Sequence, residues 1–223
     1  MGHHAAVWLP LNADLDELRL RIVSRNPCSV DAPSLSKWAS LAEDNPRLFD
    51  GPILSFRRLE DETIEAGVES YMRLITRQPG VCHLAVTGVL ERNGSVLLGL
   101  RSEQSGVHPG VWEFVPSGGM EVPMADLLTG DAFFAQLIDE LNEEVAGWSV
   151  SSPRVMGLVI DPAVPSCDLV IRASARPNAE ADQGSWEHLK LAWVEVGDLS
   201  AFAASKPCIP TVAPIAAALL GGA

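Results

Sequence analysis

The sequence predicts an α/β fold, in which helices cover both faces of a mixed sheet, preceded by an N-terminal α+β extension. Three observations predict it. Aliphatic runs typical of strands alternate with helical segments along residues 79–223. The pair Asn93-Gly94 separates two such runs and favours a tight hairpin. An amphipathic helix is expected over Asp131–Gly147, where apolar side chains recur at intervals of three and four.

The extension is expected to occupy residues 1–78 and the main domain residues 79–223, because Pro79-Gly80 favours a turn or linker between them. Its expected elements are a helix over Ala13–Ser24, a second helix over Ser34–Ala42 capped by Ser34, a strand over Pro52–Leu59, a partner strand or turn over Thr63–Gly67, and a helix over Glu69–Arg77.

The main domain is expected to begin with the hairpin and to end in helices. Its expected strands are Val81–Glu91, Ser95–Leu100, Trp112–Val115, Arg154–Ile160, Asp168–Ala173 and Leu189–Val196. A polar loop is expected at Pro177–Gly184, a short helix capped by Asp198, and a terminal helix over Thr211–Leu220. Trp112 packs in the core or stacks on a base, and core packing is the favoured interpretation.

The helix over Asp131–Gly147 carries three carboxylates besides its apolar stripe of Phe134, Leu137, Ile138, Leu141 and Val145. Spacings of three and four place Glu140 beside Glu143 and Glu144. Like charges gathered in this way repel one another, and a hard divalent cation would relieve the repulsion. The alternative is a solvated acidic face without any ligand.

This helix follows two strand-like segments and a glycine turn. The turn is Ser117–Glu121, and it carries an acid. A strand, a glycine turn and an acidic helix in this order resemble the Nudix hydrolases, whose signature is G(5x)E(7x)REUxEExGU with U aliphatic. Gly119 matches the first glycine, Glu140 the glutamate of RE, and Glu143 with Glu144 the EE pair. The resemblance implies the Nudix topology for the α/β/α sandwich.

The chain departs from the signature at four places. Asp139 replaces the arginine. Ala146 stands at the last glycine, and Gly147, one residue later, is expected to allow a left-handed helix end. Gly119 and Glu140 lie 21 positions apart (140 minus 119), six more than the signature has, so an insertion is expected within 122–130. The isolated glutamate of the signature has no clear counterpart, since the nearby Glu121 is in another register.

These departures are similar to those of the uridine-diphosphate-sugar hydrolases within the Nudix superfamily, which also lack the arginine and carry a longer loop before the helix. Two further segments look like that branch: the N-terminal region containing Leu48–Pro52 and Gly67–Leu74, and the last strand region Ser185–Val196. The resemblance implies hydrolysis of a nucleoside diphosphate sugar to a nucleoside monophosphate and a sugar 1-phosphate.

The resemblance also implies a set of site residues. Mg²⁺, or Mn²⁺ in its place, would be held by Glu140 and Glu144, with Glu143 as a ligand or a supporting neighbour. Gly118 and Gly119 would bring backbone amides close to the phosphates. Arg101 forms either a phosphate contact or an ordinary surface salt bridge. Glu187 is the first candidate for the proton acceptor and His188 the second, although each could be an ordinary surface residue.

Composition limits the classes of partner. Sixteen basic against 29 acidic residues give a formal net charge of −13, which disfavours binding to a polynucleotide backbone but not to a small anionic nucleotide. No apolar span is long enough for a membrane helix, and the start of the sequence lacks an export leader. The four dispersed cysteines indicate reduced thiols. A cytoplasmic protein is therefore expected, with its oligomeric state open.

Three alternatives remain at this point. A Nudix enzyme could act on ADP-ribose, a dinucleotide or a modified nucleoside triphosphate. A catalytically inactive Nudix-fold module could bind a nucleotide, which the missing arginine and the displaced glycine favour. A structural or interaction protein would use every acid as surface decoration and would show no selective affinity for metal at the helix.

Overall fold

The computed structural model describes residues 5–11, 13–45, 48–105, 107–177 and 187–221. Within these ranges the strands are β1 (Val7–Pro10), β2 (Arg19–Ser24), β3 (Pro52–Glu60), β4 (Thr63–Ser70), β5 (His83–Arg92), β6 (Ser95–Arg101), β7 (Trp112–Phe114), β8 (Ser117–Gly119), β9 (Leu127–Thr129), β10 (Trp148–Asp161), β11 (Ser166–Pro177) and β12 (His188–Glu195). The helices are α1 (Ala32–Asp44), α2 (Tyr71–Ile75), α3 (Asp131–Glu144), α4 (Leu199–Ser205) and α5 (Val212–Gly221), with the 3₁₀ turn η1 (Val196–Asp198) before α4.

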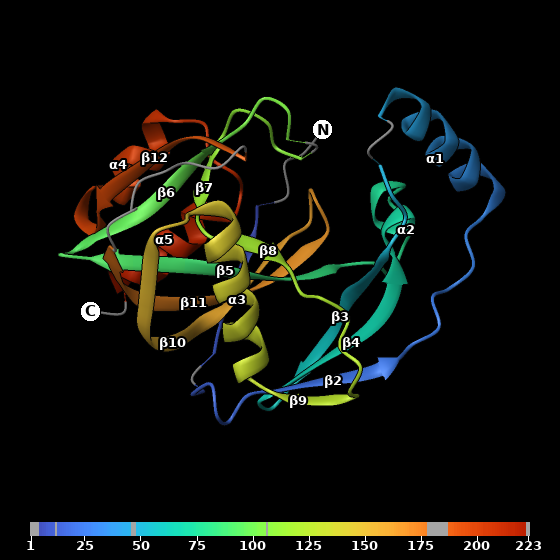
Figure 1. Cartoon of the computed structure of the whole chain (residues 1–223), viewed down its shortest axis with the longest axis horizontal. Coiled ribbons are helices and arrows are strands. Elements are labelled where there is room, and N and C mark those ends of the chain that lie inside the picture. The colour runs from blue at the N-terminus through green and yellow to red at the C-terminus, as the bar shows by residue number, and fades with distance from the viewer. Residues whose placement is uncertain (1–4, 12, 46–47, 106, 178–186, 222–223) are drawn as a thin grey trace.

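The described strands join one mixed sheet centred on β5, which pairs with β11, β3, β6 and β8. The longest path through it runs β1-β10-β11-β5-β3-β4-β2-β9 (Figure 1). β11 runs parallel to β5, and β2 runs parallel to β4, while the other pairs are antiparallel. The seven residues from Leu84 to Leu90 are all buried, which is expected of a strand covered on both faces.

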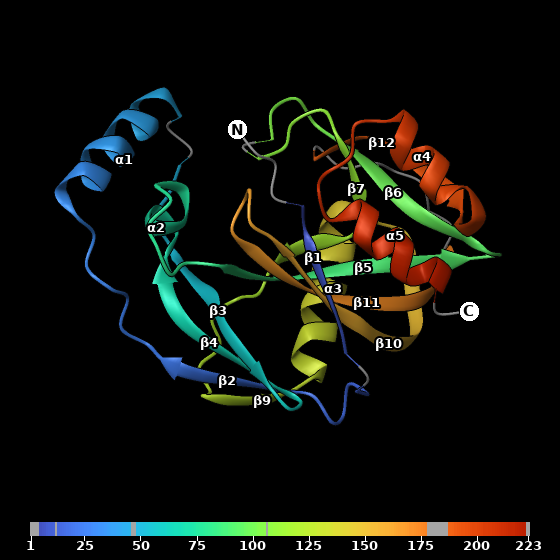
Figure 2. The same cartoon turned by 180° about the vertical axis from the view of Figure 1, so that it is seen from behind.

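Helices cover both faces of this sheet. α3 lies on one face, where Phe133 and Leu137 pack with Leu84 and Val86 of β5. α4 and α5 lie on the other face, which Figure 2 shows from behind, and there Ile215 packs with residues of β5 and β11. The predicted fold class, an α/β/α sandwich with a mixed sheet, is therefore confirmed.

The hairpin between β5 and β6 forms as predicted. Arg92 pairs with Ser95, and both turn residues have positive φ, 52° at Asn93 and 78° at Gly94. This is the combination that a two-residue turn of type I′ requires, because its twist matches that of the flanking strands. Trp112 is buried in the core and packs edge-on against Phe202, with ring centroids 5.2 Å apart, so core packing is also confirmed.

The extension contains β1, β2, β3, β4, α1 and α2, and one of its predicted helices is wrong. Residues 19–24 form a strand, in which Leu20 and Ile22 are buried while Arg21 and Val23 are exposed. This alternation is the period of a strand with one buried face, and pairing with β4 overrides the local helical preference. The predicted helix over 34–42 is confirmed within α1, although the cap is Asp31, whose Oδ1 accepts a hydrogen bond from the Ser34 amide (2.8 Å).

Other predicted elements differ in extent or capping. The helix expected over Glu69–Arg77 is only α2, because Glu69 belongs to β4 and its buried carboxylate pairs with Arg73 and Arg57. The glycine turn at 117–119 is the short strand β8. The predicted cap Asp198 makes no capping hydrogen bond with its side chain. Most of the predicted loop at 177–184 lies outside the described residues.

The segment predicted as an insertion connects back to the extension. Within it, β9 pairs antiparallel with β2 at one end of the sheet. Arg25 Nε lies 2.7 Å from Asp126 Oδ1, and the same guanidinium donates to the carbonyls of Pro123, Met124 and Ala125 at 2.9 Å each. The domain boundary near residue 79 remains a prediction, and strands β1 and β2 pair with strands beyond it.

Candidate functional site

The glycine strand and the acidic helix meet at one point, which we call the acidic corner and define as Gly118, Glu140, Glu144 and Glu187. Gly118 and Gly119 face opposite sides of β8. A Cβ atom on Gly118 would overlap the carboxyl group of Glu140, so that only glycine lets this carboxylate lie against the strand. The Ser117 amide donates to Glu144 Oε2 (3.2 Å). Two parts of the sequence more than 20 residues apart, 117–119 and 140–144, are therefore in direct contact.

The helix places its three glutamates in different environments. Its buried face consists of Phe133, Leu137, Leu141 and Glu144, so Glu144 shares the apolar face instead of lying apart from it as the sequence suggested. Glu140 is partly buried and Glu143 is exposed. The positive φ of Gly147 (93°) shows that the displaced glycine takes the left-handed conformation just beyond the helix, as predicted.

The corner is unfavourable for negative charge. Burial raises the pKa of Glu144 well above its usual value, and the carboxylates of Glu113, Glu187 and Glu140 raise it further, against the hydrogen bond from Ser117. Burial also raises the pKa of Glu140; the hydrogen bond from Gln136 Nε2 (2.9 Å) lowers it, while Glu143, Glu187 and Asp139 raise it. Glu187 thus acts electrostatically on both helical carboxylates, and its role in the site stays a prediction.

Arg101 and His188 converge on Glu113, a residue that the sequence reasoning missed. Glu113 lies in β7 between two buried aromatic residues and is only 3% exposed. Arg101 Nη1 pairs with Glu113 Oε1, and His188 Nε2 lies 2.9 Å from the same oxygen. Arg101 Nε also donates to the Val107 carbonyl (3.0 Å). The sequence did offer a signal for Glu113, because this acid lies between two apolar residues of a short strand. A carboxylate buried in that way requires polar partners.

Oxygen ligands and excess negative charge at the corner suit a hard divalent cation. In the described part of the chain, however, no three acidic, histidine or cysteine side chains converge closely enough to hold an ion. The donor set therefore fits the predicted metal in chemistry and charge, while the side-chain positions are not those of a formed site. His188, the second candidate proton acceptor, is buried beneath Glu113 and packs against Gly99.

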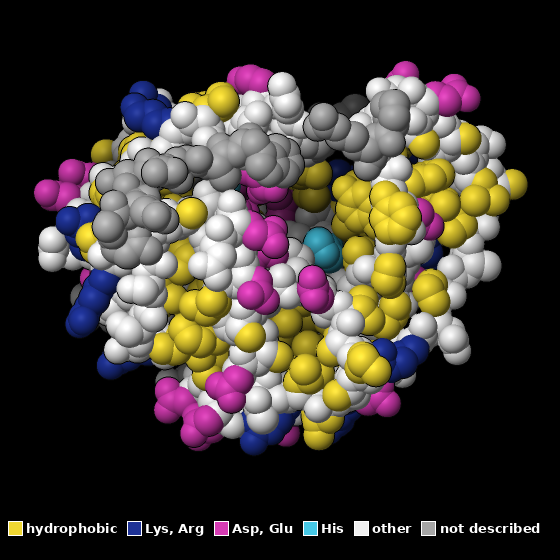
Figure 3. All heavy atoms as spheres, in the orientation of Figure 1, with side chains coloured by type: hydrophobic (Ala, Val, Ile, Leu, Met, Phe, Trp, Pro, Cys, Tyr) yellow, Lys and Arg dark blue, Asp and Glu magenta, His cyan; other side chains and the backbone are white. Residues whose placement is uncertain are grey.

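A cleft of about 480 Å³ opens beside the corner, between the extension and the main body. This volume suits a small organic ligand. Gly118, Gly119, Glu113 and Arg101 are among its lining residues, whereas the helical glutamates are not. Figure 3 shows the hollow, with acidic side chains along one side and hydrophobic side chains on the other.

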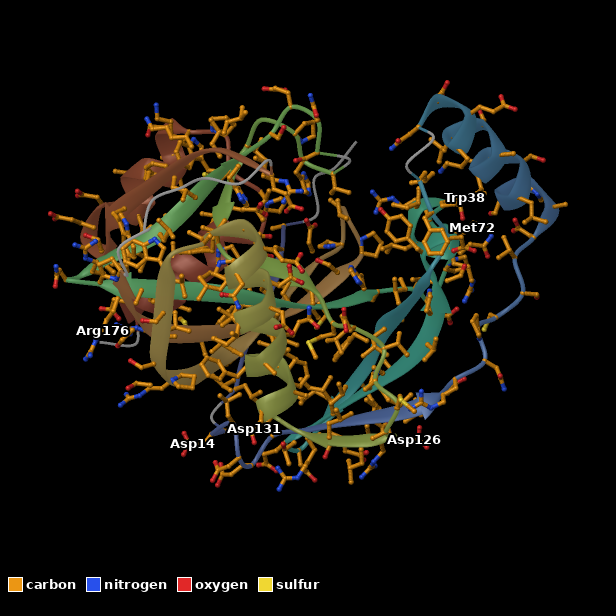
Figure 4. All side chains as sticks on the ribbon, in the orientation of Figure 1. Asp14, Trp38, Met72, Asp126, Asp131 and Arg176 are labelled. Carbon is orange, nitrogen blue, oxygen red and sulfur yellow. The ribbon has the colours of Figure 1, made fainter. Side chains whose placement is uncertain are left out.

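The extension supplies one wall of the cleft. The wall combines apolar and basic side chains from α1, α2 and the residues that follow α2: Lys37, Leu41, Tyr71, Leu74, Ile75 and Arg77. Trp38 supports it, because its ring meets Tyr71 edge-on with centroids 6.4 Å apart. Figure 4 shows Trp38 and Met72 where α1 faces α2. The extension therefore shapes the cleft.

The floor of the cleft carries polar residues that the sequence reasoning also missed. His83 packs on Gly119, since a Cβ there would lie 2.5 Å from its Nε2, and burial lowers the pKa of this imidazole to about 4. Asp168 stands in β11, and at one edge His108 Nε2 lies 3.5 Å from Asp161 Oδ2. In the sequence, Asp168 could have been noticed as an acid within the apolar run that forms β11.

The four cysteines, all within the described residues, form no disulfide, in agreement with the prediction of free thiols. No helix among the described residues is long and apolar enough to cross a membrane.

No family model and no curated protein matches the chain. Three solved structures are similar to part of this chain. A NUDIX hydrolase from Nitrosomonas europaea has 14% identity and a TM-score of 0.48 over 63% of this chain and 90% of that chain, and a NUDIX hydrolase from Alicyclobacillus acidocaldarius has 17% identity and a TM-score of 0.49 over 62% of this chain and 91% of that chain. A bifunctional NMN adenylyltransferase/ADP ribose pyrophosphatase from Francisella tularensis has 17% identity and a TM-score of 0.49 over 68% of this chain and 44% of that chain. These values are too low to carry a conclusion about what this chain does.

Proposed function

We propose that this chain is a metal-dependent hydrolase of the Nudix type that cleaves the phosphoanhydride bond of a nucleoside diphosphate linked to another group. The observation that carries the proposal is the contact between the glycine strand β8, at the two residues before Gly119, and the acidic helix. Gly118 has no side chain where the Glu140 carboxylate lies, and the Ser117 amide holds Glu144. An acidic helix that were only a solvated surface would not bury Glu144 against a glycine strand.

In this proposal the corner binds the diphosphate and the cleft binds the rest of the ligand. Glu140 and Glu144 are the cation ligands, and the exposed Glu143 is a further ligand or a neighbour that adds negative charge. When bound, Mg²⁺ or Mn²⁺ would neutralise charge that develops on the phosphates and acidify a water molecule. The amides of Gly118 and Gly119 and the guanidinium of Arg101 contact phosphate oxygens.

Glu187 is the proposed proton acceptor. It belongs to the loop before β12, and its charge raises the pKa of both Glu140 and Glu144, which supports a position close to the proposed cation ligands. A carboxylate close to the cation ligands is a suitable group to accept a proton from the attacking water. His188 is not proposed, because its Nε2 already lies against Glu113.

The proposed substrate is a uridine diphosphate sugar. The similarity of the altered signature to that branch supports it, as does an extension that lines the cleft and could contact the half of the ligand away from the reacting phosphates. ADP-ribose, dinucleotides and modified nucleoside triphosphates are the competing substrates within the same reaction class.

The test is a hydrolysis panel of UDP-glucose, UDP-galactose, ADP-ribose, a dinucleotide and 8-oxo-dGTP, with Mg²⁺, with Mn²⁺ and with a chelator. We expect UMP and a sugar 1-phosphate from the UDP-sugars with metal and no product with chelator. Glu144→Gln should reduce turnover by about 100-fold or more, whereas Asp131→Asn at the far end of the same helix (Figure 4) should retain it. Equal turnover by Glu144→Gln would remove this glutamate from the mechanism, and turnover of adenine compounds alone would remove the uridine assignment.

A nucleotide-binding module without catalysis is the second candidate. It is favoured by the absence of a convergent metal cluster among the described residues and by Asp139 at the arginine position of the signature. Binding of UDP-glucose without hydrolysis under any metal condition would establish this alternative.

A further inference from the structure

Asp168 occupies the floor of the cleft because of strand register. Across β11, β5 and β8, Asp168 is paired with Ala85, which in turn is paired with Gly119. Alternate residues of a strand point to opposite faces, and the neighbours Cys167 and Leu169 belong to the apolar core. Asp168 therefore points toward the cleft that it lines, where its neighbour Ala85 is small and His83 covers Gly119.

The carboxylate of Asp168 is only half satisfied. The residue is 7% exposed, and its Oδ2 accepts a hydrogen bond from Thr87 Oγ1 (2.9 Å). Its Oδ1 is buried and accepts no hydrogen bond of normal geometry among the described residues, although the Ser166 hydroxyl lies close enough to act on the carboxylate. A buried acceptor without a partner destabilises the folded state, so the fold alone does not account for an aspartate here.

A chain of hydrogen bonds connects Asp168 with the acidic corner. Thr87 gives its hydroxyl proton to Asp168, and the Ser117 hydroxyl lies 3.1 Å from Thr87 Oγ1 and must therefore be the donor in that pair. The backbone amide of the same Ser117 donates to Glu144. The side chain of Asp168 is thus held in place through the strand that carries the glycines.

The surroundings select the kind of ligand group that Asp168 would take. A carboxylate repels phosphate, and the nearby Glu113 and Asp161 add to the negative charge. The opposite wall offers Tyr71 and Leu74, which suit an uncharged planar or ring-shaped group. The neutral hydrogen-bond donors of a nucleotide, which are the hydroxyls of its sugars and the N–H groups of its base, match this environment.

We propose that Asp168 is a specificity-determining residue, whose Oδ1 accepts a hydrogen bond from a hydroxyl or N–H group on the part of the nucleotide that does not react. The inference rests on the proposed function for the identity of the ligand class. It adds to that function the place where the uncharged half binds, and it requires no metal for this contact.

The experiment measures the affinity of UDP-glucose by isothermal titration calorimetry with a chelator present. In Asp168→Asn, the charged acceptor opposite the ligand donor is replaced by an amide N–H or by an uncharged oxygen. We expect UDP-glucose to bind this variant 10- to 100-fold more weakly. Thr87→Val, which removes the hydroxyl that holds the carboxylate, should weaken binding less. The matched control Asp198→Asn changes an exposed aspartate remote from the cleft and should bind as the unmodified protein does. Circular dichroism would confirm that each variant is folded.

Three ligand analogues identify the source of the donor: a 2′-deoxyribose, an N3-methyluracil and a 2-deoxyglucose form of UDP-glucose. We expect one of them to bind the unmodified protein as weakly as UDP-glucose binds Asp168→Asn, and to lose nothing further in that variant. If Asp168→Asn binds UDP-glucose as tightly as the unmodified protein, or if every analogue weakens binding equally in both proteins, the proposal is wrong.

The outcomes separate this inference from the proposed function. Hydrolysis of UDP-glucose with unchanged affinity in Asp168→Asn would overturn the inference alone. Affinity that depends on Asp168, without hydrolysis under any metal condition, would overturn the hydrolase and leave the inference standing. If none of the nucleotides in the panel binds, both are wrong.

Discussion

Replacing Asp168 by Asn should stabilise the protein, and the gain should depend on pH. Burial raises the pKa of Asp168 from 3.8 to about 6. A tenfold change in proton affinity is worth about 1.4 kcal/mol, so the ionised side chain costs the folded state about 3 kcal/mol. The hydroxyls of Thr87 and Ser166 lower this pKa, while Glu113 and Asp161 raise it.

The sign of the pH dependence follows from which state binds the proton more tightly. Below pH 3.8 the carboxyl is protonated in both states and has no such cost. Between pH 3.8 and about 6 the unfolded chain ionises first, so stability falls as pH rises, and above pH 6 the full cost is present. Asp168→Asn should therefore raise the free energy of unfolding by up to about 3 kcal/mol at pH 8 and by about 0.5 kcal/mol at pH 4.

Urea denaturation followed by circular dichroism at pH 4, 6 and 8 measures this difference. The unpartnered amide that Asn introduces would reduce the gain but not its dependence on pH. Asp161→Asn provides a control in which the substitution should destabilise the protein. Burial raises the pKa of Asp161, but the nearby His108 side chain and the hydrogen bonds from the amides of Ala163 and Val164 outweigh it, so that this pKa is lowered. A pH-independent effect of Asp168→Asn, or a loss of stability at pH 8, would refute the reasoning.

Three further predictions concern other residues. Gly118→Ala should reduce the rate of hydrolysis by about tenfold or more, because the added Cβ would displace the Glu140 carboxylate. The control Gly197→Ala adds a Cβ with no atom near it and should keep the rate. Equal rates in the two variants would contradict the proposed role of the acidic corner. The unmodified protein should lose stability as pH falls from 6.5 toward 4, because the unfolded chain protonates His83 more readily than the folded protein does. His83→Gln should lose less stability over this range, and identical unfolding curves for the two proteins would exclude this role. Arg25→Ala should speed proteolytic cleavage near the fully exposed Met124 with less than about 1 kcal/mol lost in overall stability; a cleavage rate matching that of Arg154→Ala would show that Arg25 does not hold the segment.

Local sequence patterns correctly predicted the elements that have a clear apolar periodicity or a turn sequence with few alternatives. Asn93-Gly94 predicted its hairpin because two positive φ angles in succession suit few other pairs. The helix α3 followed from its apolar spacing, and the glycine after it from the need to end a helix. Residues 19–24 were misread because leucines and isoleucine at short intervals satisfy both periods, and only pairing with β4 and β9 decides between them.

The sequence by itself placed Glu140, Glu143 and Glu144 on one helix and singled out Gly118 and Gly119, although for an approach to phosphates and not for the packing of Glu140. Only the tertiary structure decided that Glu144 is buried and Glu143 exposed, that Glu113 and Asp168 join the same region, and that the extension forms a wall of the cleft. The physical reason is that periodicity reports which face of an element is apolar. Which elements then face one another depends on strand order and register, and these depend on contacts between residues far apart in the chain.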